Sequence, residues 1–409
     1  MRMILKKWSV LLLLIGLTLL FGLMLTFPDS SWKAAVRGLA IWWDVLFPSL
    51  FPFFVISEMM LGFGIVHFIG MLLDPLMKPL FRIPGSGGFV AAMSFASGYP
   101  VSAKLTSKLR EQQLITREEG ERLVAFTTTS DPIFLIGAVS VGFFHNPQLA
   151  GTLAVAHYGS SLLVGLLMRY HAPKATPSPT AARTGFSLRL AVKAMHEARL
   201  RDDRTFGEQL RQSVVSALQL MTVVGGLVVI FSVLLEVLSA SGLMTQLYEL
   251  IRQVLTVLQL PPALAEPLVG GGFEVTLGAK SSAAVPASVP LAFKAAAAAF
   301  ILSWAGLSVH AQIASILNGT GLRYFPFLIA RMIHAVLAAL MVLLLWPLTG
   351  PDTEVFLSFG DSSLFQSGWS GLSSAGLLTL QTLSLLLILS FFISIIQHLW
   401  NKPKAWKWK

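Results

Sequence analysis

Two short stretches combine glycine, hydroxyl and lysine residues inside long apolar sequence. One is Ser97-Gly98-Tyr99-Pro100-Val101-Ser102-Ala103-Lys104, and the other runs from Gly270 through Glu274 to Lys280. Non-helical backbone at bilayer depth is tolerated only where protein buries it or a water-filled cavity receives it. Paired interruptions of this kind point to the binding site of a transporter. We therefore predict two re-entrant broken helices that bind a small solute.

The charged residues of these stretches suggest what the solute is. A lysine at the centre of a membrane helix costs about 2.5–3.5 kcal/mol on insertion scales, so Lys104 and Lys280 at matched positions indicate binding of an anion. The alternative is that each lysine extends from the end of a hairpin to the lipid headgroups. Glu274 is predicted to hold a coupling proton or cation, or to pair with Lys280 six residues further on.

A run of hydroxyl residues ends in an acid and a proline: Thr127-Thr128-Thr129-Ser130-Asp131-Pro132. Such hydroxyls often bond back to their own helix, but four before a helix-breaking Asp-Pro favour the lining of a cavity. The second half has a counterpart that contains Ser303, Gly306, Ser308, His310 and Gln312. From Gly306 onward these residues recur at spacings of two and four, which favours a single polar face.

Three further ionisable residues, His157, Arg331 and His334, lie within apolar stretches. An arginine can bind a carboxylate through two parallel hydrogen bonds, and histidine can carry protons. Pairing with Glu58 or Glu236 is the structural alternative. The predicted substrate-binding set is Ser97, Gly98, Tyr99, Ser102, Lys104, Thr127, Thr128, Thr129, Asp131, Glu274, Lys280, Ser303, Ser308, His310 and Arg331.

The composition identifies the class of protein that must position these residues. Of 409 residues, 55% are hydrophobic and 12% charged, against about 25% charged in soluble domains. We therefore predict an integral membrane protein, whose net charge of +10 marks cytoplasmic loops rather than nucleic-acid binding. The lack of cysteine excludes thiolate catalysis. No catalytic motif is present, and Gly278-Ala279-Lys280-Ser281 is not a phosphate-binding loop because an alanine separates Gly from Lys. We expect no enzyme activity, cofactor or metal.

The apolar stretches predict eight membrane spans, at about 8–27, 44–66, 123–143, 148–168, 213–238, 291–316, 324–347 and 376–398. The interrupted segments 85–107 and 262–288 are expected to enter and leave on one face, and 67–82 and 243–260 to lie at the interface. The basic N-terminus, linker and C-terminal tail are assigned to the cytoplasm and the acidic segment 349–375 to the outside.

A nearly constant offset relates the two halves. Glu58 and Glu236 are 178 residues apart, Lys104 and Lys280 176, and His157 and His334 177. Each half has three spans, an odd number, so we predict an all-α polytopic membrane protein of two inverted repeats, each with a re-entrant broken helix. The expected regions are an N-terminal anchor helix and interfacial segment (1–43), a first repeat (44–170), a basic linker (171–211), a second repeat (212–348), and an outer loop with a last span and basic tail (349–409).

Three motifs resemble the YlbJ-type sporulation integral membrane proteins of endospore-forming bacteria. They are Gly38 to Pro48, Phe89 to Pro100, and Glu121 to Thr127, and the similarity is clearest over 1–347. The resemblance implies that the repeats 44–170 and 212–348 are two nucleoside-recognition (Gate) domains. It also implies movement of dipicolinic acid from the mother cell across the outer forespore membrane. A nucleoside or related heterocycle is the alternative substrate. A third possibility is a non-transporting assembly protein that binds a partner through the linker.

Other partners are left open by the sequence. The bilayer surrounds the chain, a proton or sodium ion is a candidate for coupling, and homo-oligomerisation is neither favoured nor excluded. The resemblance supplies no site residues.

Overall fold

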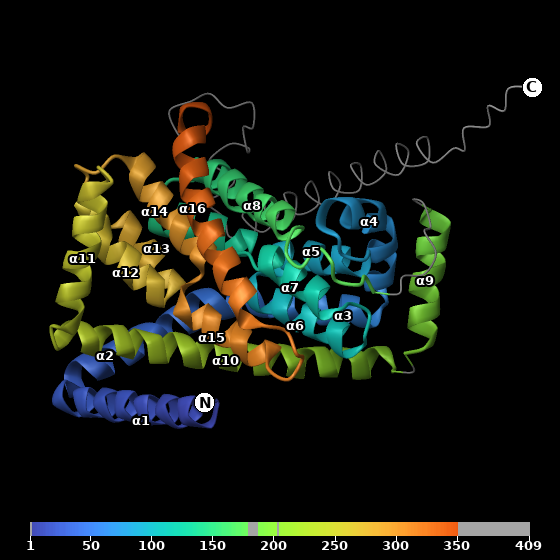
Figure 1. Ribbon diagram of the computed structural model, residues 1–409, viewed down its shortest axis with the longest axis horizontal. Helices are drawn as coiled ribbons and strands as arrows, with labels where there is room; N and C mark the ends of the chain where they lie inside the picture. Colours follow the sequence, from blue (N-terminus) through green and yellow to red (C-terminus); the bar gives the residue numbers. More distant parts are fainter. Residues whose placement is uncertain (1, 179–186, 203, 351–409) are drawn as a thin grey trace, which may run out of the picture.

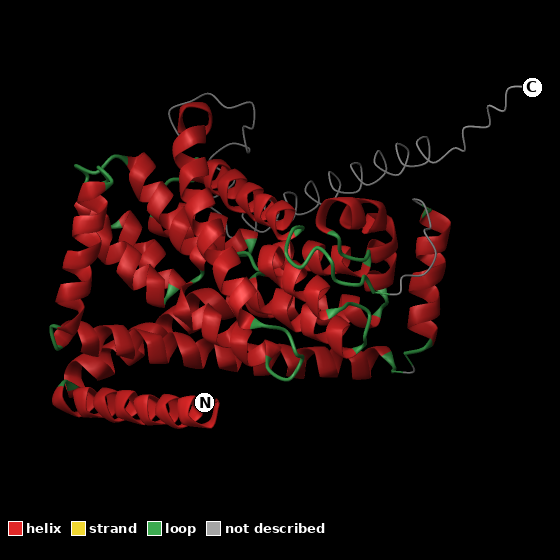
Figure 2. Cartoon of the chain, viewed as in Figure 1, coloured by secondary structure: helices red, strands yellow, loops and turns green. Residues whose placement is uncertain are grey.

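The computed structural model describes residues 2–178, 187–202 and 204–350. All regular elements in these ranges are helical (Figure 2), so the prediction of an all-α protein is confirmed for them. The predicted loop 349–375, apart from its first two residues, and the last span 376–398 lie outside the described residues. Four described helical stretches are long and apolar enough to cross a membrane, one of them the interrupted Leu291–Leu317, and there are five if the bent pair α1–α2 is also counted as one span. The prediction of eight spans is therefore supported only in part.

Two long helical segments support the rest of the fold. The first comprises α2 (Pro28–Ala40), the π-helical η1 (Ile41–Leu46) and α3 (Phe47–Gly62), and the second is α10 (Phe206–Ala240), 35 residues long. They pack antiparallel, because Arg37 pairs with Glu236 at 2.6 Å while the Gln209 side chain donates to the Met59 carbonyl at 3.1 Å. In Figure 1, α10 runs along one side of the molecule.

Glycines allow these two segments to approach closely. A Cβ atom on Gly38 would lie 2.9 Å from the Val229 backbone, and one on Gly225 would lie 2.5 Å from the Trp42 indole nitrogen. The indole uses the space to donate to the Met221 carbonyl at 2.9 Å. α1 (Arg2–Thr26), which contains the first predicted span, is bent from α2 by 103°.

The same order of elements follows each long segment. A glycine in the left-handed region, Gly64 (φ 75°) or Gly242 (φ 78°), leads into α4 (Ile65–Phe81) or α11 (Leu243–Val257). These are the two stretches expected to lie at the interface. In Figure 1, α11 lies at one end of α10, and α9 (Leu188–Leu200), the helix of the basic linker, lies at the other.

A helix hairpin comes next in each half. α5 (Ser86–Ser97) packs on α6 (Tyr99–Glu111), and α12 (Ala265–Phe273) packs on α13 (Val275–Ala283) after the short 3-10 helix η3 (Pro262–Leu264). Gly98, with φ 83° and ψ −172°, forms the first break, and extended Glu274 forms the second. Gly271 and Gly278 allow α12 and α13 to touch, because a Cβ atom on Gly278 would lie 2.1 Å from the Gly271 Cα.

Two predicted spans are also interrupted, which corrects the expectation of continuous helices there. α7 (Arg117–Thr127) ends before the non-helical segment 128–131, and after Pro132 the π-helical η2 (Ile133–Phe143) follows. α14 (Leu291–Trp304) stops at Ala305, whose φ is 74°, and α15 (Gly306–Leu317) follows. Long helices close each half: α8 (Leu149–Met168) and α16 (Tyr324–Thr349), which both pack on α14.

Candidate functional site

A cavity of about 50 Å³ lies where the second helices of all four broken pairs begin. Its walls come from the first turns of α6, η2, α13 and α15, with an apolar side from η1 and α10. The lining residues are Leu46, Tyr99, Pro100, Asp131, Phe134, Val224, Val228, Glu274, Val275, Thr276, Ser308, Val309 and Gln312. A single water occupies about 30 Å³ of liquid, so this conformation has room for a water molecule or a small ion.

Carboxylates cap two of the helix starts at this cavity. The first N–H groups of a helix have no partner within it and carry partial positive charge. Asp131 Oδ1 accepts from the Phe134 N–H at 2.8 Å, and Glu274 Oε2 accepts from the Leu277 N–H at 2.7 Å. Asp131 is 5% exposed and Glu274 1%. Chain breaks in both halves therefore bring two buried acids to one site.

The cavity also holds polar atoms without partners. The hydroxyl of Ser308 and the amide oxygen of Gln312 are buried and make no hydrogen bond within the described residues. Native proteins rarely leave such atoms unsatisfied, so a bound water, ion or ligand is the usual explanation. Because no Lys or Arg belongs to the described lining, its chemistry suits a cation or a neutral polar group better than a free anion.

Arg331 contacts the C-terminal ends of the first helices at two of the four breaks. Its buried guanidinium donates to the carbonyls of Ala125 and Thr128, with a longer contact to Ser303 at 3.4 Å. These carbonyls belong to the C-terminal ends of α7 and α14, which have no helical partners and carry partial negative charge. Arg331 does not line the cavity. Its guanidinium offsets the partial negative charge of these backbone carbonyls instead of binding a carboxylate.

Histidines bridge the same two helix breaks. His157 Nε2 accepts from the Ser130 N–H at 3.0 Å, so its proton lies on Nδ1, which contacts the Ser303 hydroxyl at 2.8 Å. His334 Nε2 contacts the His157 carbonyl at 2.8 Å, and His310 contacts the Trp304 carbonyl at 3.0 Å. In this conformation the ring of each of these three histidines hydrogen-bonds to a backbone group. The alternative pairing with Glu58 or Glu236 is not observed.

The predicted hydroxyls mostly connect helices. Ser102 Oγ lies 2.6 Å from Thr127 Oγ1 and accepts from Thr128 at 3.2 Å, which joins α6 to α7. Thr129 is buried with an unpartnered hydroxyl, yet it is not part of the lining. Ser97 is buried at the end of α5, and Gly98 faces Asp131, whose Oδ2 would lie 3.2 Å from a Cβ atom there. Tyr99 lines the cavity while its hydroxyl donates to the Leu302 carbonyl at 2.7 Å.

The two lysines do not meet. Lys104 forms an ion pair with Glu58 of α3 and donates to Ser216 of α10 at 2.6 Å. Lys280 is exposed on α13. Each follows its helix break by six residues, which at 1.5 Å per residue is about 9 Å along the helix. Lys104 and Lys280 therefore do not converge on one anion site, which their matched positions had predicted.

The structure therefore brings together five members of the predicted set at the cavity: Tyr99, Asp131, Glu274, Ser308 and, through its contact with Asp131, Gly98. It adds Gln312, which the polar face of the second half had indicated, and Thr276. It also adds the α10 wall, Val224 and Val228, for which a continuous apolar helix gives no signal. Within the described ranges no three His, Asp or Glu side chains are grouped to hold a metal ion.

Comparison with known proteins adds family information. A model of the Gate family, described as nucleoside recognition, matches residues 44–145, within the first of the two regions predicted to be Gate-like. The sporulation integral membrane protein YlbJ of Bacillus subtilis is 44% identical over 382 residues, which cover 91% of this chain and 93% of that protein. An uncharacterized protein of Alkalihalophilus pseudofirmus is 26% identical over 173 residues, 40% of this chain and 35% of that one.

Among solved structures, the chain is similar to a CNTnw variant in an outward-facing state. The sequence identity is 12% and the TM-score 0.40, with 81% of this chain and 86% of the other covered.

Proposed function

The chain belongs to the family of sporulation integral membrane proteins that includes YlbJ, and we propose that it is a membrane transporter of a small polar solute. The observation that carries the proposal is the convergence of four helix starts on one cavity, whose largely apolar lining includes the buried polar side chains of Asp131, Glu274, Ser308 and Gln312. Broken helices at the middle of the membrane are a recurring way to build solute sites, because their ends supply polar backbone without loss of helical structure elsewhere. At about 50 Å³ the cavity must enlarge before an organic solute can enter.

The proposal includes two inverted repeats. The 178-residue offset that relates Glu58 to Glu236 takes position 37 to 215. Arg37 pairs with Glu236, and Glu58 accepts from Ser216, next to position 215, at 3.4 Å. The two contacts are thus near images of each other. Two equivalent segments that pack antiparallel are what inverted halves require, and such halves can exchange roles as the site opens first to one side and then to the other.

Dipicolinic acid, moved into the forespore across its outer membrane, is the substrate that we propose from the family resemblance. Asp131 and Glu274 would repel a free dianion, so it must enter with protons or with a cation. A nucleoside is the second candidate, because the carboxylates, the Ser308 hydroxyl and the Gln312 amide can all hydrogen-bond a neutral heterocycle or sugar.

Uptake by the purified chain in liposomes tests these proposals. We expect labelled dipicolinate or uridine to accumulate above the level in protein-free liposomes, with pH and sodium gradients varied separately to identify the coupling ion. Excess unlabelled uridine should slow dipicolinate uptake only if both share the cavity. Failure of both solutes to accumulate under every gradient would contradict the proposal.

The matched variants are Asp131→Asn and Glu274→Gln, which keep side-chain size but remove the charge. Each should reduce uptake at least about tenfold, the effect of roughly 1.4 kcal/mol. Glu249→Gln, at an exposed carboxylate on α11, should leave uptake unchanged.

A further inference from the structure

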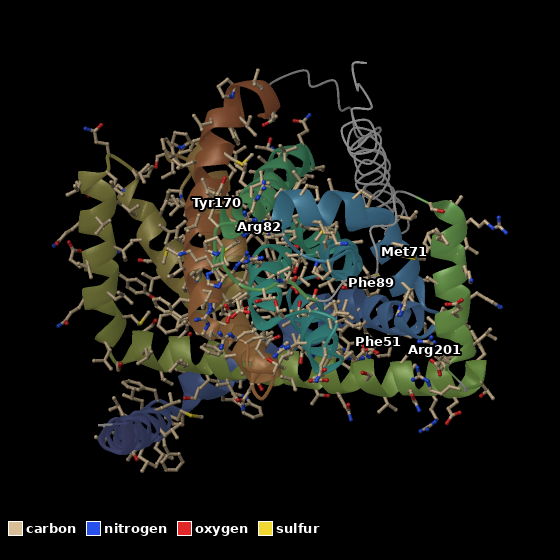
Figure 3. All side chains as sticks on the ribbon, turned by 45° about the vertical axis from the view of Figure 1, so that its right-hand side comes forward. Phe51, Met71, Arg82, Phe89, Tyr170 and Arg201 are labelled. Carbon is tan, nitrogen blue, oxygen red and sulfur yellow. The ribbon has the colours of Figure 1, made fainter. Side chains whose placement is uncertain are left out.

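A second cavity, of about 450 Å³, lies away from the helix breaks. It is bounded by the end of α4, the start of α7 and residues 173–177, the start of the basic linker after α8. Arg82, which Figure 3 labels, follows α4 directly, and its Nη1 donates to the Pro173 carbonyl at 3.5 Å. The volume is in the range of small-molecule sites.

Positive charge predominates in this cavity. Lys78, Arg82 and Arg122 contribute three cations and Glu119 the one acid of its described lining. Both oxygens of Glu119 are engaged: Oε2 accepts from the Thr116 N–H at 2.8 Å, and Oε1 accepts from the Ser178 N–H at 3.1 Å. The capping box of α7 thus holds the acid against the helix start rather than against the cations.

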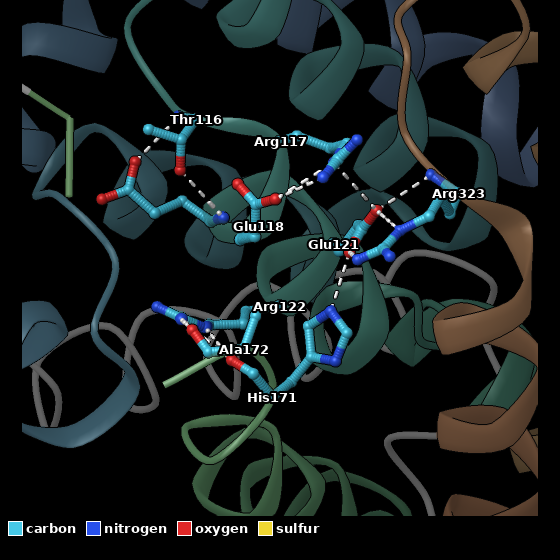
Figure 4. A network of polar contacts seen from close by, with 9 residues as sticks. Thr116, Arg117, Glu118, Glu121, Arg122, His171, Ala172 and Arg323 are labelled. Atoms are coloured by element: carbon cyan, nitrogen blue, oxygen red, sulfur yellow. Dashed lines mark hydrogen bonds and ion pairs between the residues drawn. The ribbon is translucent and has the colours of Figure 1, made fainter. Parts of the chain in front are cut away.

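Arg122 forms a rigid wall of the cavity. Its guanidinium donates to the carbonyls of Ala172 at 2.9 Å and His171 at 2.9 and 3.1 Å (Figure 4). It also donates to the Arg82 carbonyl at 2.9 Å. Burial lowers its pKa, Glu119 raises it, and the nearby charge of Arg82 lowers it again, so that it lies below the usual value. An anion beside these two guanidinium groups would offset their repulsion.

The position of the cavity limits what can reach it. α4 occupies the stretch expected at the membrane interface, and the linker is expected on the cytoplasmic side because of its lysines and arginines. The cytoplasmic leaflet carries anionic lipids, and basic pockets at this level bind their headgroups. Arg82 is exposed at the end of α4, so its guanidinium is accessible to a ligand from outside the fold.

We propose that the cavity between α4, α7 and residues 173–177 binds a phosphate group, supplied by an anionic phospholipid of the cytoplasmic leaflet. Arg82 and Lys78 contact the phosphate, while Arg122 fixes the wall behind it. Inorganic phosphate has the same chemistry and is the other source that a test must separate. The proposal does not depend on which solute the chain transports.

The test measures thermal unfolding of the full chain in nanodiscs of phosphatidylcholine, with and without phosphatidylglycerol. A ligand that binds only the folded protein raises the unfolding midpoint, so phosphatidylglycerol should raise it for the unchanged chain by a few degrees. The variant Lys78→Gln/Arg82→Gln should lose this gain, yet it retains the Arg82 carbonyl that Arg122 needs. The control Arg189→Gln/Arg211→Gln removes the same charge from exposed positions on α9 and α10 and should keep the gain.

Inorganic phosphate added to pure phosphatidylcholine nanodiscs identifies the source. No effect at millimolar phosphate supports the lipid, whereas an equal gain that the double variant abolishes supports the phosphate site but overturns the lipid source. Native mass spectrometry should count bound phosphatidylglycerol, fewer on the double variant than on the control. Equal retention by both would overturn the proposal. If the double variant does not fold, Lys78→Gln alone serves in the same comparison.

Discussion

Glu121 near the start of α7 and Arg323 just before α16 form a bidentate ion pair across 202 residues of sequence (Figure 4). Arg323 donates from Nε and Nη2 at 2.8 Å and from its backbone N–H at 3.1 Å. His171 Nε2 lies 2.7 Å from Glu121 Oε2, the oxygen that also accepts from Arg323 Nη2. Glu121 therefore joins the Gate-matching segment to the second half of the chain.

Glu121→Gln should destabilise this junction. The Glu121 side chain is fully buried while that of Arg323 is 51% exposed, so we expect a loss of about 1–3 kcal/mol, typical of hydrogen bonds to charged groups. A lower unfolding midpoint in detergent, relative to Glu249→Gln, would be the readout. Equal midpoints for both variants would show that the pair contributes little.

The same carboxylate makes stability depend on pH. Burial raises the pKa of Glu121, but the hydrogen bonds from Arg323 and His171 and the charge of Arg323 outweigh it, so that its pKa lies below the ordinary 4.5. A depressed pKa gives stabilisation that is complete above the unfolded-state pKa and is lost as the pH falls through the folded-state pKa. The difference in midpoint between the unchanged chain and Glu121→Gln should therefore persist from pH 7 to about 5 and shrink below 4.5. A difference that stays constant down to pH 3 would exclude this linkage.

Arg331→Met should unfold the region of the helix breaks rather than only weaken substrate binding. The variant leaves the carbonyls of Ala125 and Thr128 buried without donors, at about 1–3 kcal/mol for each unsatisfied group. We expect a large drop in midpoint and in the amount of folded protein, measured by size-exclusion chromatography. A variant of normal stability that no longer transports would instead assign Arg331 to the substrate, as the sequence alone had suggested.

The two lysines should differ in their effects. Lys280→Gln changes an exposed side chain and should leave uptake within about twofold, a range of roughly 0.4 kcal/mol. Lys104→Gln removes the ion-pair partner of Glu58 and should lower the unfolding midpoint. If Lys280→Gln abolished uptake at normal protein levels, the solute path would have to include the outer face of α13.

Alanine substitutions at Gly64 and Gly242 form a matched pair that tests how closely the linker helix α9 packs against the fold. Both have positive φ, so alanine is strained at either position by about 1–2 kcal/mol. A Cβ atom on Gly64 would also lie 2.7 Å from the Met195 carbonyl of α9, whereas on Gly242 it would meet nothing within 4 Å. Gly64→Ala should therefore lower the midpoint more than Gly242→Ala. Equal losses would mean that α9 moves aside without cost.

The sequence predicted the hairpin breaks because glycine, proline and acidic residues disrupt apolar helices in recognisable ways. Gly98 and Glu274 lie at those breaks, and Asp131-Pro132 marked the third as a polar segment. The fourth break was missed because Ala305, whose φ is 74°, is a good helix former, and because Gly306 after it, whose φ is 73°, was interpreted as part of a polar face. Propensity is a local quantity that tertiary contacts override.

The candidate site was predicted less well than the fold. Charge at membrane depth was interpreted as function, which selected Glu274, a residue of the cavity lining, together with Lys104, Lys280 and Arg331, which do not line it. The roles of these cations depend on side-chain direction around each helix and on distant partners such as Glu58 and the Ala125 carbonyl. Periodicity within one segment contains no information about either.

Cysteine modification at Ser308 tests most directly whether the solute passes through the cavity. The chain has no cysteine, so Ser308→Cys introduces a single thiol into the cavity wall. In liposomes, a charged thiol reagent should abolish uptake by this variant, and saturating solute should slow the modification. Complete modification that leaves uptake unchanged would contradict the proposed path.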